Sequence, residues 1–189
     1  PFWVQKLYDQ TPQRIRPCIG CNQGCFGYLY TNRPITCAVN PAVGHEKTLG
    51  YGTEIPASGR HVLVVGGGPA GMEAAIAASE RGLDVTIAEA TNALGGQIPL
   101  ASSIDSRAEL GSIIDFQISE LKRLNVDIRL ETTIDKTAMV AINPDTVIIA
   151  TGSQPRSKPI PGDESIHVIS PIDAMKSPEV HTGKKAIII

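Results

Sequence analysis

Residues 61–71 read HVLVVGGGPAG, in which a run of mostly β-branched residues leads directly into a glycine-rich turn. The apolar run at 61–65 is typical of a buried strand, and the alanine-rich residues 72–81 predict a helix that ends at Gly82. Residues 84–88 predict a second strand. A strand, a turn, a helix and a second strand in this order indicate a parallel sheet.

The same alternation continues along the chain. An apolar stripe interrupted only by Gln117 predicts an amphipathic helix over residues 107–124. The expected fold class is therefore α/β, a Rossmann-like three-layer sandwich with a parallel sheet covered on both faces. Further strands are expected at 126–130, 146–150 and 166–169, and short helices at 1–10 and 170–175.

The turn contains the pattern G-x-G-x-x-G at Gly66, Gly68 and Gly71. In a dinucleotide site the first glycine permits a tight turn, the second lets a pyrophosphate approach the backbone, and the third lets helix and strand pack closely. Glu89 ends the second strand 18 residues after Gly71, where a carboxylate accepts hydrogen bonds from ribose hydroxyls and disfavours a 2′-phosphate. The pattern predicts a dinucleotide site, the alternative being a glycine-rich turn that holds no ligand.

Two other stretches favour FAD over NAD as the dinucleotide. Residues 94–97, Leu-Gly-Gly-Gln, follow the second strand, where an extended ligand could run past bare backbone. Residues 150–152, Ala-Thr-Gly, offer a second place for close approach, although they could also be an ordinary turn. The helix after the glycine-rich turn supplies N–H groups and a partial positive charge for the phosphates. The expected cofactor-binding residues are Gly66, Gly68, Pro69, Ala70, Gly71, Glu89, Gly95, Gly96, Gln97, Ala150, Thr151 and Gly152.

All four cysteines of the chain lie close together, as Cys18, Cys21, Cys25 and Cys37. Three thiolates on one tight loop and a fourth from returning chain suit a cubic iron–sulfur cluster, and neighbouring glycines let the backbone bend around it. A zinc site is the main alternative, although structural zinc sites usually have two paired C-x2-C units. A disulfide pair is a further alternative, which a cytosolic compartment disfavours.

Three basic residues lie near the cysteines in the sequence, namely Arg14, Arg16 and Arg33. One hypothesis is that they offset the negative charge of a thiolate-ligated cluster and so raise its reduction potential. The alternative is that they are solvated surface charges.

The composition excludes several classes of protein. Hydrophobic residues make up 42% and charged residues 19% of the 189 residues, as in an ordinary globular protein. With a net charge of −2, no general attraction to nucleic acid is expected. No apolar run approaches the roughly 18 residues that a membrane helix needs, and the start lacks a signal-peptide pattern. A cytoplasmic location is therefore expected.

Taken together, these motifs resemble those of a known enzyme family. Arg16–Gln23, Cys37–Pro41, the glycine-rich turn and residues 94–97 and 150–152 are similar, in this order, to the 2,4-dienoyl-CoA reductase and trimethylamine dehydrogenase family, NADH:flavin oxidoreductases related to old yellow enzyme. The resemblance implies an upstream FMN-binding barrel with the substrate site, then a four-iron–four-sulfur (4Fe-4S) cluster, then an FAD or ADP domain with a nested NAD(P) domain. The four cysteines would be the cluster ligands.

The resemblance also divides the chain, both of whose ends are expected to be cut from a longer protein. Residues 1–58 would hold the tail of the barrel, the 4Fe-4S cluster-binding segment and a linker. Residues 59–182 would be an incomplete FAD (or ADP) domain, and residues 183–189 the first strand of a truncated NAD(P)-binding domain. The expected fold is then a Rossmann-like FAD/NAD(P)-binding sandwich preceded by an irregular iron–sulfur segment.

The function implied by the resemblance is electron transfer within an FMN/FAD/4Fe-4S oxidoreductase that reduces an activated C=C bond with NAD(P)H. The alternative is an amine dehydrogenase, similar to trimethylamine or dimethylamine dehydrogenase, with ADP in the dinucleotide site. Such an enzyme passes electrons to an external acceptor, for example an electron-transfer flavoprotein. A small-molecule substrate would bind in the barrel, an oligomer is compatible with the pattern, and no catalytic residue is assigned within this chain.

Overall fold

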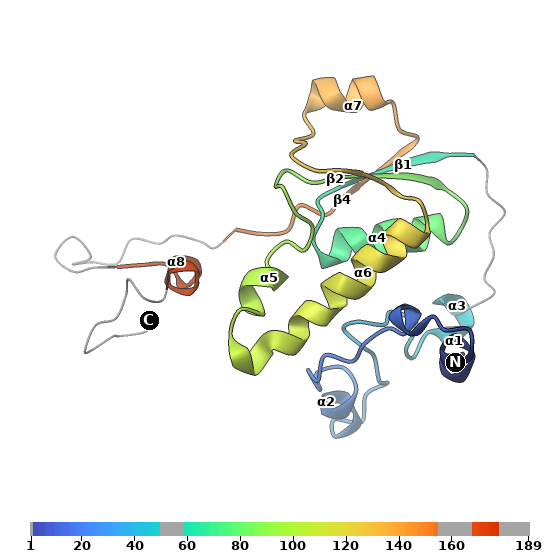
Figure 1. Ribbon diagram of the computed structural model, residues 1–189, viewed down its shortest axis with the longest axis vertical. Helices are drawn as coiled ribbons and strands as arrows, with labels where there is room; N and C mark the ends of the chain where they lie inside the picture. Colours follow the sequence, from blue (N-terminus) through green and yellow to red (C-terminus); the bar gives the residue numbers. More distant parts are fainter. Residues whose placement is uncertain (1, 50–58, 155–167, 178–189) are drawn as a thin grey trace.

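The computed structural model describes residues 2–49, 59–154 and 168–177 (Figure 1). Its centre is a four-stranded, all-parallel sheet with the strand order β3-β2-β1-β4. The strands are β1 (His61–Val65), β2 (Asp84–Ala88), β3 (Asp127–Arg129) and β4 (Thr146–Ile149). All four lie at the positions that the sequence predicts, with β3 and β4 shorter than expected by one or two residues. The mixed α/β fold class with a parallel sheet is thus confirmed.

β1 is one of the two inner strands of the sheet, paired with β2 on one side and with β4 on the other. Val62 lies opposite Val85 of β2 and Thr146 of β4. Leu63 and Val64 are fully buried, as is Ile87 of β2. A strand with neighbours on both edges and helices above it has no solvated face, which is why its sequence is a continuous apolar run rather than an alternating one.

Helices α4 (Pro69–Ser79) and α6 (Ser112–Arg123) pack against each other on one side of the sheet (Figure 1). α4 begins at Pro69, earlier than the sequence predicts, because proline is favoured at the first helical position. Gly82 has a φ of 76°, the left-handed conformation expected after a helix end. The first turns of the helix expected at 107–124 are instead a 3-10 helix, η2 (Asp105–Gly111).

α7 (Lys136–Ile142) lies on the opposite side of the sheet from α4 and α6 (Figure 1). The sequence reasoning missed this helix, although its capping residues are present. Asp135 accepts a hydrogen bond from the Ala138 amide at 2.7 Å, and Asn143 ends the helix with a left-handed φ of 47°. No residue of α7 is buried, so it covers the second face only loosely.

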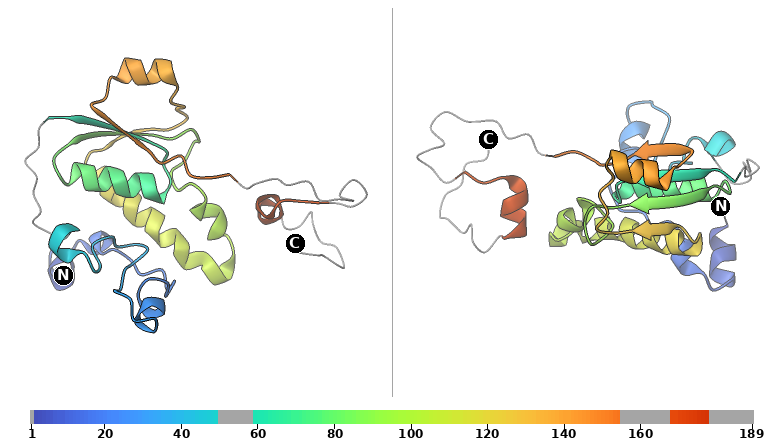
Figure 2. Two further views of the ribbon diagram at one scale, coloured as in Figure 1. Left: turned by 180° about the vertical axis from the view of Figure 1, so that it is seen from behind. Right: turned by 90° about the horizontal axis from the view of Figure 1, so that it is seen from above.

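The N-terminal segment runs beside α4 and α6 on their side away from the sheet, as the left view in Figure 2 shows. Val39 joins the hydrophobic core, and Ile19 and Cys37 pack against it. The helices expected at 1–10 and 170–175 are confirmed as α1 (Trp3–Tyr8) and α8 (Pro171–Lys176). The remaining short helices are η1 (Pro12–Arg14), α2 (Phe26–Leu29), α3 (Glu46–Leu49) and α5 (Ile98–Ala101).

Two expected strands lie partly or wholly outside the described residues. Residues 166 and 167 of the strand expected at 166–169 lie outside the described residues, and 168–169 are not in a strand. The strand expected at 183–189 lies wholly outside them, as does most of the linker at 51–59. The proposed domain boundaries therefore stay a prediction.

Candidate functional site

The glycine-rich turn follows β1 directly and is held in a conformation that side chains would block. Gly66 has a φ of 110°, and a Cβ there would collide with the carbonyl of Ala150. A Cβ on Gly71 would collide with the carbonyl oxygen of Gly66. Both positions require glycine because the backbone packs against itself, which agrees with the roles that the sequence pattern gives to the first and third glycines.

Gly68 has the opposite environment, with open space where a side chain would stand. The nearest atom to a Cβ built there is the Cα of Gly96, at 3.9 Å. α4 begins at the next residue, and no side chain caps this helix end. The first N–H groups of α4 therefore face bare backbone, the arrangement in which a helix N-terminus binds phosphate.

The loop at residues 94–97 lies against this turn. The Gly95 amide donates to the Gly67 carbonyl at 2.9 Å, and a Cβ on Gly96, whose φ is 56°, would lie 3.1 Å from the Cα of Gly68. Gln97 Nε2 donates to the carbonyl of Ser153 at 2.8 Å, next to Gly152. The structure thus brings three separate stretches together at the carboxyl ends of β1, β2 and β4.

Glu89 binds the turn itself, a contact that the sequence reasoning did not foresee. Its Oε2 accepts the Gly67 amide at 2.6 Å, and its Oε1 accepts the amide and the hydroxyl of Thr91, each at 2.8 Å. Burial alone would raise the pKa of Glu89, but these hydrogen bonds outweigh it and lower the pKa below its ordinary value. The carboxylate is therefore charged at neutral pH, and its remaining lone pairs can accept further donors.

The cysteine segment brings two of its thiol-bearing stretches side by side. The Thr36 amide donates to the Gly24 carbonyl at 2.8 Å, and a Cβ on Gly24 would collide with Thr36. Cys25 and Cys37 directly follow these two residues. Upstream, Gly20 and Asn22 have left-handed φ values of 63° and 53°, which bend the loop that carries Cys18 and Cys21.

All four cysteines are free thiols, so the disulfide alternative is not observed in the described residues. Cys18 and Cys25 are exposed, whereas Cys21 and Cys37 are half-buried. Within residues 2–49, 59–154 and 168–177, no three His, Cys, Asp or Glu side chains are gathered closely enough to hold a metal ion. Free thiols on adjoining backbone turns suit the chemistry of cluster ligation, and the ligand set stays a prediction.

The three arginines near the cysteines have protein partners. Arg16 Nη1 donates to the Val39 carbonyl at 2.7 Å and to Glu73 Oε2 at 2.8 Å. Arg14 lies 3.9 Å from Glu120, and Arg33 lies over the Tyr28 ring with its Cζ 5.6 Å from the centroid. Arg16 is thus not a freely solvated charge, and its charge is offset by a carboxylate.

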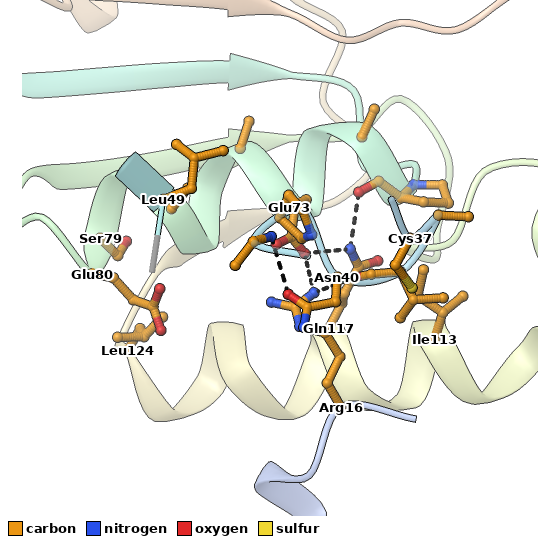
Figure 3. Close-up of a pocket in the computed structure, with 18 of the residues that line it drawn as sticks. Arg16, Cys37, Asn40, Leu49, Glu73, Ser79, Glu80, Ile113, Gln117 and Leu124 are labelled. Carbon is orange, nitrogen blue, oxygen red and sulfur yellow. Dashed lines mark hydrogen bonds and ion pairs between the residues drawn. The ribbon is translucent and has the colours of Figure 1, made fainter. Parts of the chain in front are cut away.

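A groove of about 970 Å³ is lined jointly by the cysteine segment, α4 and α6 (Figure 3). Cys37 and Asn40 line it from the cysteine segment, Glu73 from α4, and Ile113 and Gln117 from α6. It reaches the first turn of α4, but none of the three motif glycines lines it. Pro69 and Ala70 do line it, so the groove and the dinucleotide turn adjoin at the start of α4.

A parallel sheet whose first turn exposes bare backbone at an uncapped helix start has the geometry of a Rossmann-like dinucleotide-binding fold. Residues 60–189 match the family described as pyridine nucleotide-disulphide oxidoreductase, and the chain belongs to this family. No helix within the described part of the chain is long and apolar enough to cross a membrane.

Curated relatives cover the cysteine segment as well as the sheet. The chain is 40% identical over 165 residues to an NADH oxidase of Thermoanaerobacter brockii, covering 87% of this chain and 25% of the relative. It is 39% identical over 197 residues to an N,N-dimethylglycine/sarcosine dehydrogenase of Chromohalobacter salexigens, covering all of this chain and 28% of the relative. The chain thus spans only about a quarter of the length of these relatives.

A solved structure is likewise similar to nearly the whole of this chain. The fold superimposes on a 2-naphthoyl-CoA reductase in complex with 2-naphthoyl-CoA with a TM-score of 0.86 at 33% identity, over 94% of this chain and 27% of that one. These comparisons confirm the resemblance to the 2,4-dienoyl-CoA reductase and trimethylamine dehydrogenase family, and they show relatives that are reductases, oxidases and dehydrogenases.

Proposed function

We propose that the chain is the electron-transfer portion of a larger oxidoreductase that binds FAD at the glycine-rich turn and a 4Fe-4S cluster at the four cysteines. The observation that carries this proposal is the close approach of Gly96 to Gly68 at an uncapped helix start, with the segment after β4 joined to the same loop by the Gln97–Ser153 hydrogen bond. FAD is longer than NAD at its flavin end. The glycine-containing stretches at 94–97 and 150–152 offer backbone along which the longer ligand could extend, so they favour FAD. FMN and NAD(P)H would bind in parts outside this chain.

Each part of the site has a defined task in this proposal. The amides of Ala70 and Gly71, in the first turn of α4, hold the pyrophosphate, and Glu89 accepts the ribose hydroxyls while it braces the turn through Gly67. Its negative charge would repel a 2′-phosphate, so an NADP-type ligand is disfavoured here. Cys18, Cys21, Cys25 and Cys37 supply the thiolates. When bound, a flavin would supply two-electron chemistry and a cluster one-electron chemistry, so the residues that hold them would make the chain a relay.

The reaction proposed for the whole protein is reduction of an activated C=C bond by NAD(P)H, which the similarity to a 2-naphthoyl-CoA reductase and to an NADH oxidase supports. The second candidate is oxidation of a methylated amine, with electrons leaving to an external flavoprotein. It is supported by the 39% identity to an N,N-dimethylglycine/sarcosine dehydrogenase. The substrate in both cases is a small molecule bound by the barrel, and a cytoplasmic location is proposed.

Analysis of the purified full-length protein tests the cofactors first. We expect iron and acid-labile sulfide in equal amounts, with FAD as the nucleotide extracted and separated by reverse-phase chromatography. ADP in place of FAD would favour the amine dehydrogenase. Zinc without iron would refute the cluster.

Anaerobic mixing then decides the direction of electron flow. If NADH bleaches the flavin and an enoyl-CoA restores its absorbance, the protein is a reductase. If dimethylglycine or another methylated amine bleaches it and NADH does not, the protein is an amine dehydrogenase.

A further inference from the structure

The cysteine segment and α4 are joined at a single carboxylate oxygen. Glu73 Oε2 accepts Arg16 Nη1 at 2.8 Å and Gln117 Nε2 at 3.1 Å (Figure 3). Arg16 precedes Cys18 by two residues, Glu73 lies one turn after Pro69 in α4, and Gln117 belongs to α6. Three elements far apart in the sequence therefore meet at this oxygen.

Arg16 and Gln117, the two donors to Glu73, each make further contacts. Arg16 Nη1 also donates to the carbonyl of Val39, two residues after Cys37, at 2.7 Å. Its guanidinium lies over the Phe116 ring of α6, with Cζ 4.7 Å from the centroid. One arginine thus touches the chain beside the first and the last cysteine, and it holds both against the two helices.

Gln117 supplies the opposite anchor at the start of α4. Its Nε2 also donates to the carbonyl of Pro69 at 3.0 Å. Both partners of this nitrogen, a carbonyl and a carboxylate, can only accept, which fixes the orientation of the side-chain amide. Gln117 is 1% exposed, and its Oε1 has no hydrogen-bond partner among the described residues. A buried acceptor left without a donor is costly, so this glutamine is not explained by packing alone.

The Arg16–Glu73 ion pair differs from an ordinary surface salt bridge in its burial and in its hydrogen-bonding geometry. The side chains of Arg16 and Glu73 are 21% and 23% exposed, so their ion pair is partly shielded from water. Arg16 Nη1 bridges a carbonyl and a carboxylate while its plane stacks on an aromatic ring, a combination that lysine cannot reproduce. These features distinguish the pair from a surface salt bridge such as Arg123–Glu80, whose separation is 3.7 Å.

We propose that Arg16, Glu73 and Gln117 form a positioning clamp that fixes the cysteine segment relative to the first turn of α4. If the proposed function holds, the clamp sets the distance between the cluster and the flavin nucleotide; this part of the inference rests on the proposed function. None of the three residues is among the predicted ligands of either group, and they act through the backbone at Val39 and Pro69. They are positioning residues rather than catalytic ones.

The first test measures amide hydrogen exchange in the full-length protein carrying Arg16→Lys, Glu73→Gln or Gln117→Met. The first two variants are expected to speed exchange in peptides covering residues 18–25 and 36–40 by about tenfold, as for the loss of one charge-assisted hydrogen bond. Gln117→Met removes a neutral donor, fits a buried helix position and should give a smaller increase. Glu80→Gln, at the end of the same helix, is the matched control and should change nothing. Wild-type exchange in the first two variants, or equal acceleration by Glu80→Gln, would refute the clamp.

The second test uses anaerobic stopped-flow absorbance to measure the rate at which one electron passes from reduced FAD to the oxidised cluster. With iron, sulfide and flavin contents retained, the clamp variants should slow this step at least about fivefold at unchanged midpoint potentials, because only the geometry has altered. A slower rate that is fully accounted for by a shifted cluster potential would show a charge effect and overturn the positioning role. If the wild-type protein holds no cluster or flavin, the proposed function fails, and hydrogen exchange alone decides whether the clamp exists.

Discussion

The Glu89 carboxylate accepts the backbone amide of Gly67 at 2.6 Å, which ties the end of β2 to the middle of the glycine-rich turn. Glu89, which the sequence pattern predicts to bind the ribose hydroxyls, therefore also stabilises the conformation of the glycine-rich turn. Its other oxygen is held by Thr91. Binding and folding are coupled at this one side chain, so changes to it should alter both.

Replacing Glu89 with Gln tests this coupling. The amide has one acceptor oxygen, so it cannot serve Gly67 and Thr91 as the carboxylate does. We expect a loss of about 1–3 kcal/mol in the free energy of unfolding together with a lower FAD content. Chemical denaturation and the extracted flavin measure the two effects. A variant with wild-type stability and wild-type flavin content would contradict both roles.

The same residue predicts a pH dependence. The pKa of Glu89 in the folded protein lies below its ordinary value of 4.5, so the unfolded chain takes up the proton more readily. The stabilisation is therefore fully present above pH 4.5 and is lost as the pH falls through the lowered pKa. Unfolding curves of the wild type should lose more stability than those of Glu89→Gln as the pH is lowered below 4.5. Parallel pH profiles would show that the hydrogen bonds of Glu89 do not perturb its titration.

Two glycine substitutions should separate folding from binding. Ala at position 68 meets open space, and the backbone there has φ −73° and ψ 176°, which alanine adopts freely. We expect Gly68→Ala to stay within about 0.5 kcal/mol of wild type in stability but to lose flavin, because its methyl group occupies the pyrophosphate position. Gly71→Ala collides with the Gly66 carbonyl and should cost about 1–3 kcal/mol. Thermal unfolding of the apo-proteins and flavin titration measure the two quantities. Undiminished flavin binding by Gly68→Ala would place the phosphates elsewhere.

A cysteine substitution tests the cluster ligands without disturbing the core. Cys18 is exposed, so Cys18→Ala should leave the stability of the metal-free protein nearly unchanged and abolish most of the bound iron. Cys37 packs against the core, so its replacement would confuse ligand loss with packing loss. Thr31→Ala, in the same segment, is the control. Iron content equal to wild type in Cys18→Ala would remove this residue from the ligand set.

The sheet and the turn could be predicted from sequence because their signals are local. A β-branched run, a glycine pattern and an alanine-rich stretch follow one another within residues 61–81. α7 was missed because it buries no apolar face, and only its caps identify it. Glu73 was missed for another reason: in sequence it is an ordinary helix charge, and its partner Arg16 is 57 residues away. Gln117 was noticed only as a break in an apolar stripe, and the buried partners that explain it lie on α4.

The link from Gln97 to Ser153 gives a last prediction. This exposed hydrogen bond, 2.8 Å long, joins the loop after β2 directly to the segment after β4. Because it is exposed, Gln97→Ala should change stability by less than about 0.5 kcal/mol. The loop also carries Gly96, which abuts Gly68, so its loosening should weaken FAD binding several-fold. Titration of the apo-protein with FAD, followed by flavin fluorescence, gives the dissociation constant. Gln97→Met is the matched control, since its thioether cannot donate to the Ser153 carbonyl and the variant should behave like alanine. If the alanine variant binds as tightly as wild type, the bond is incidental to the site.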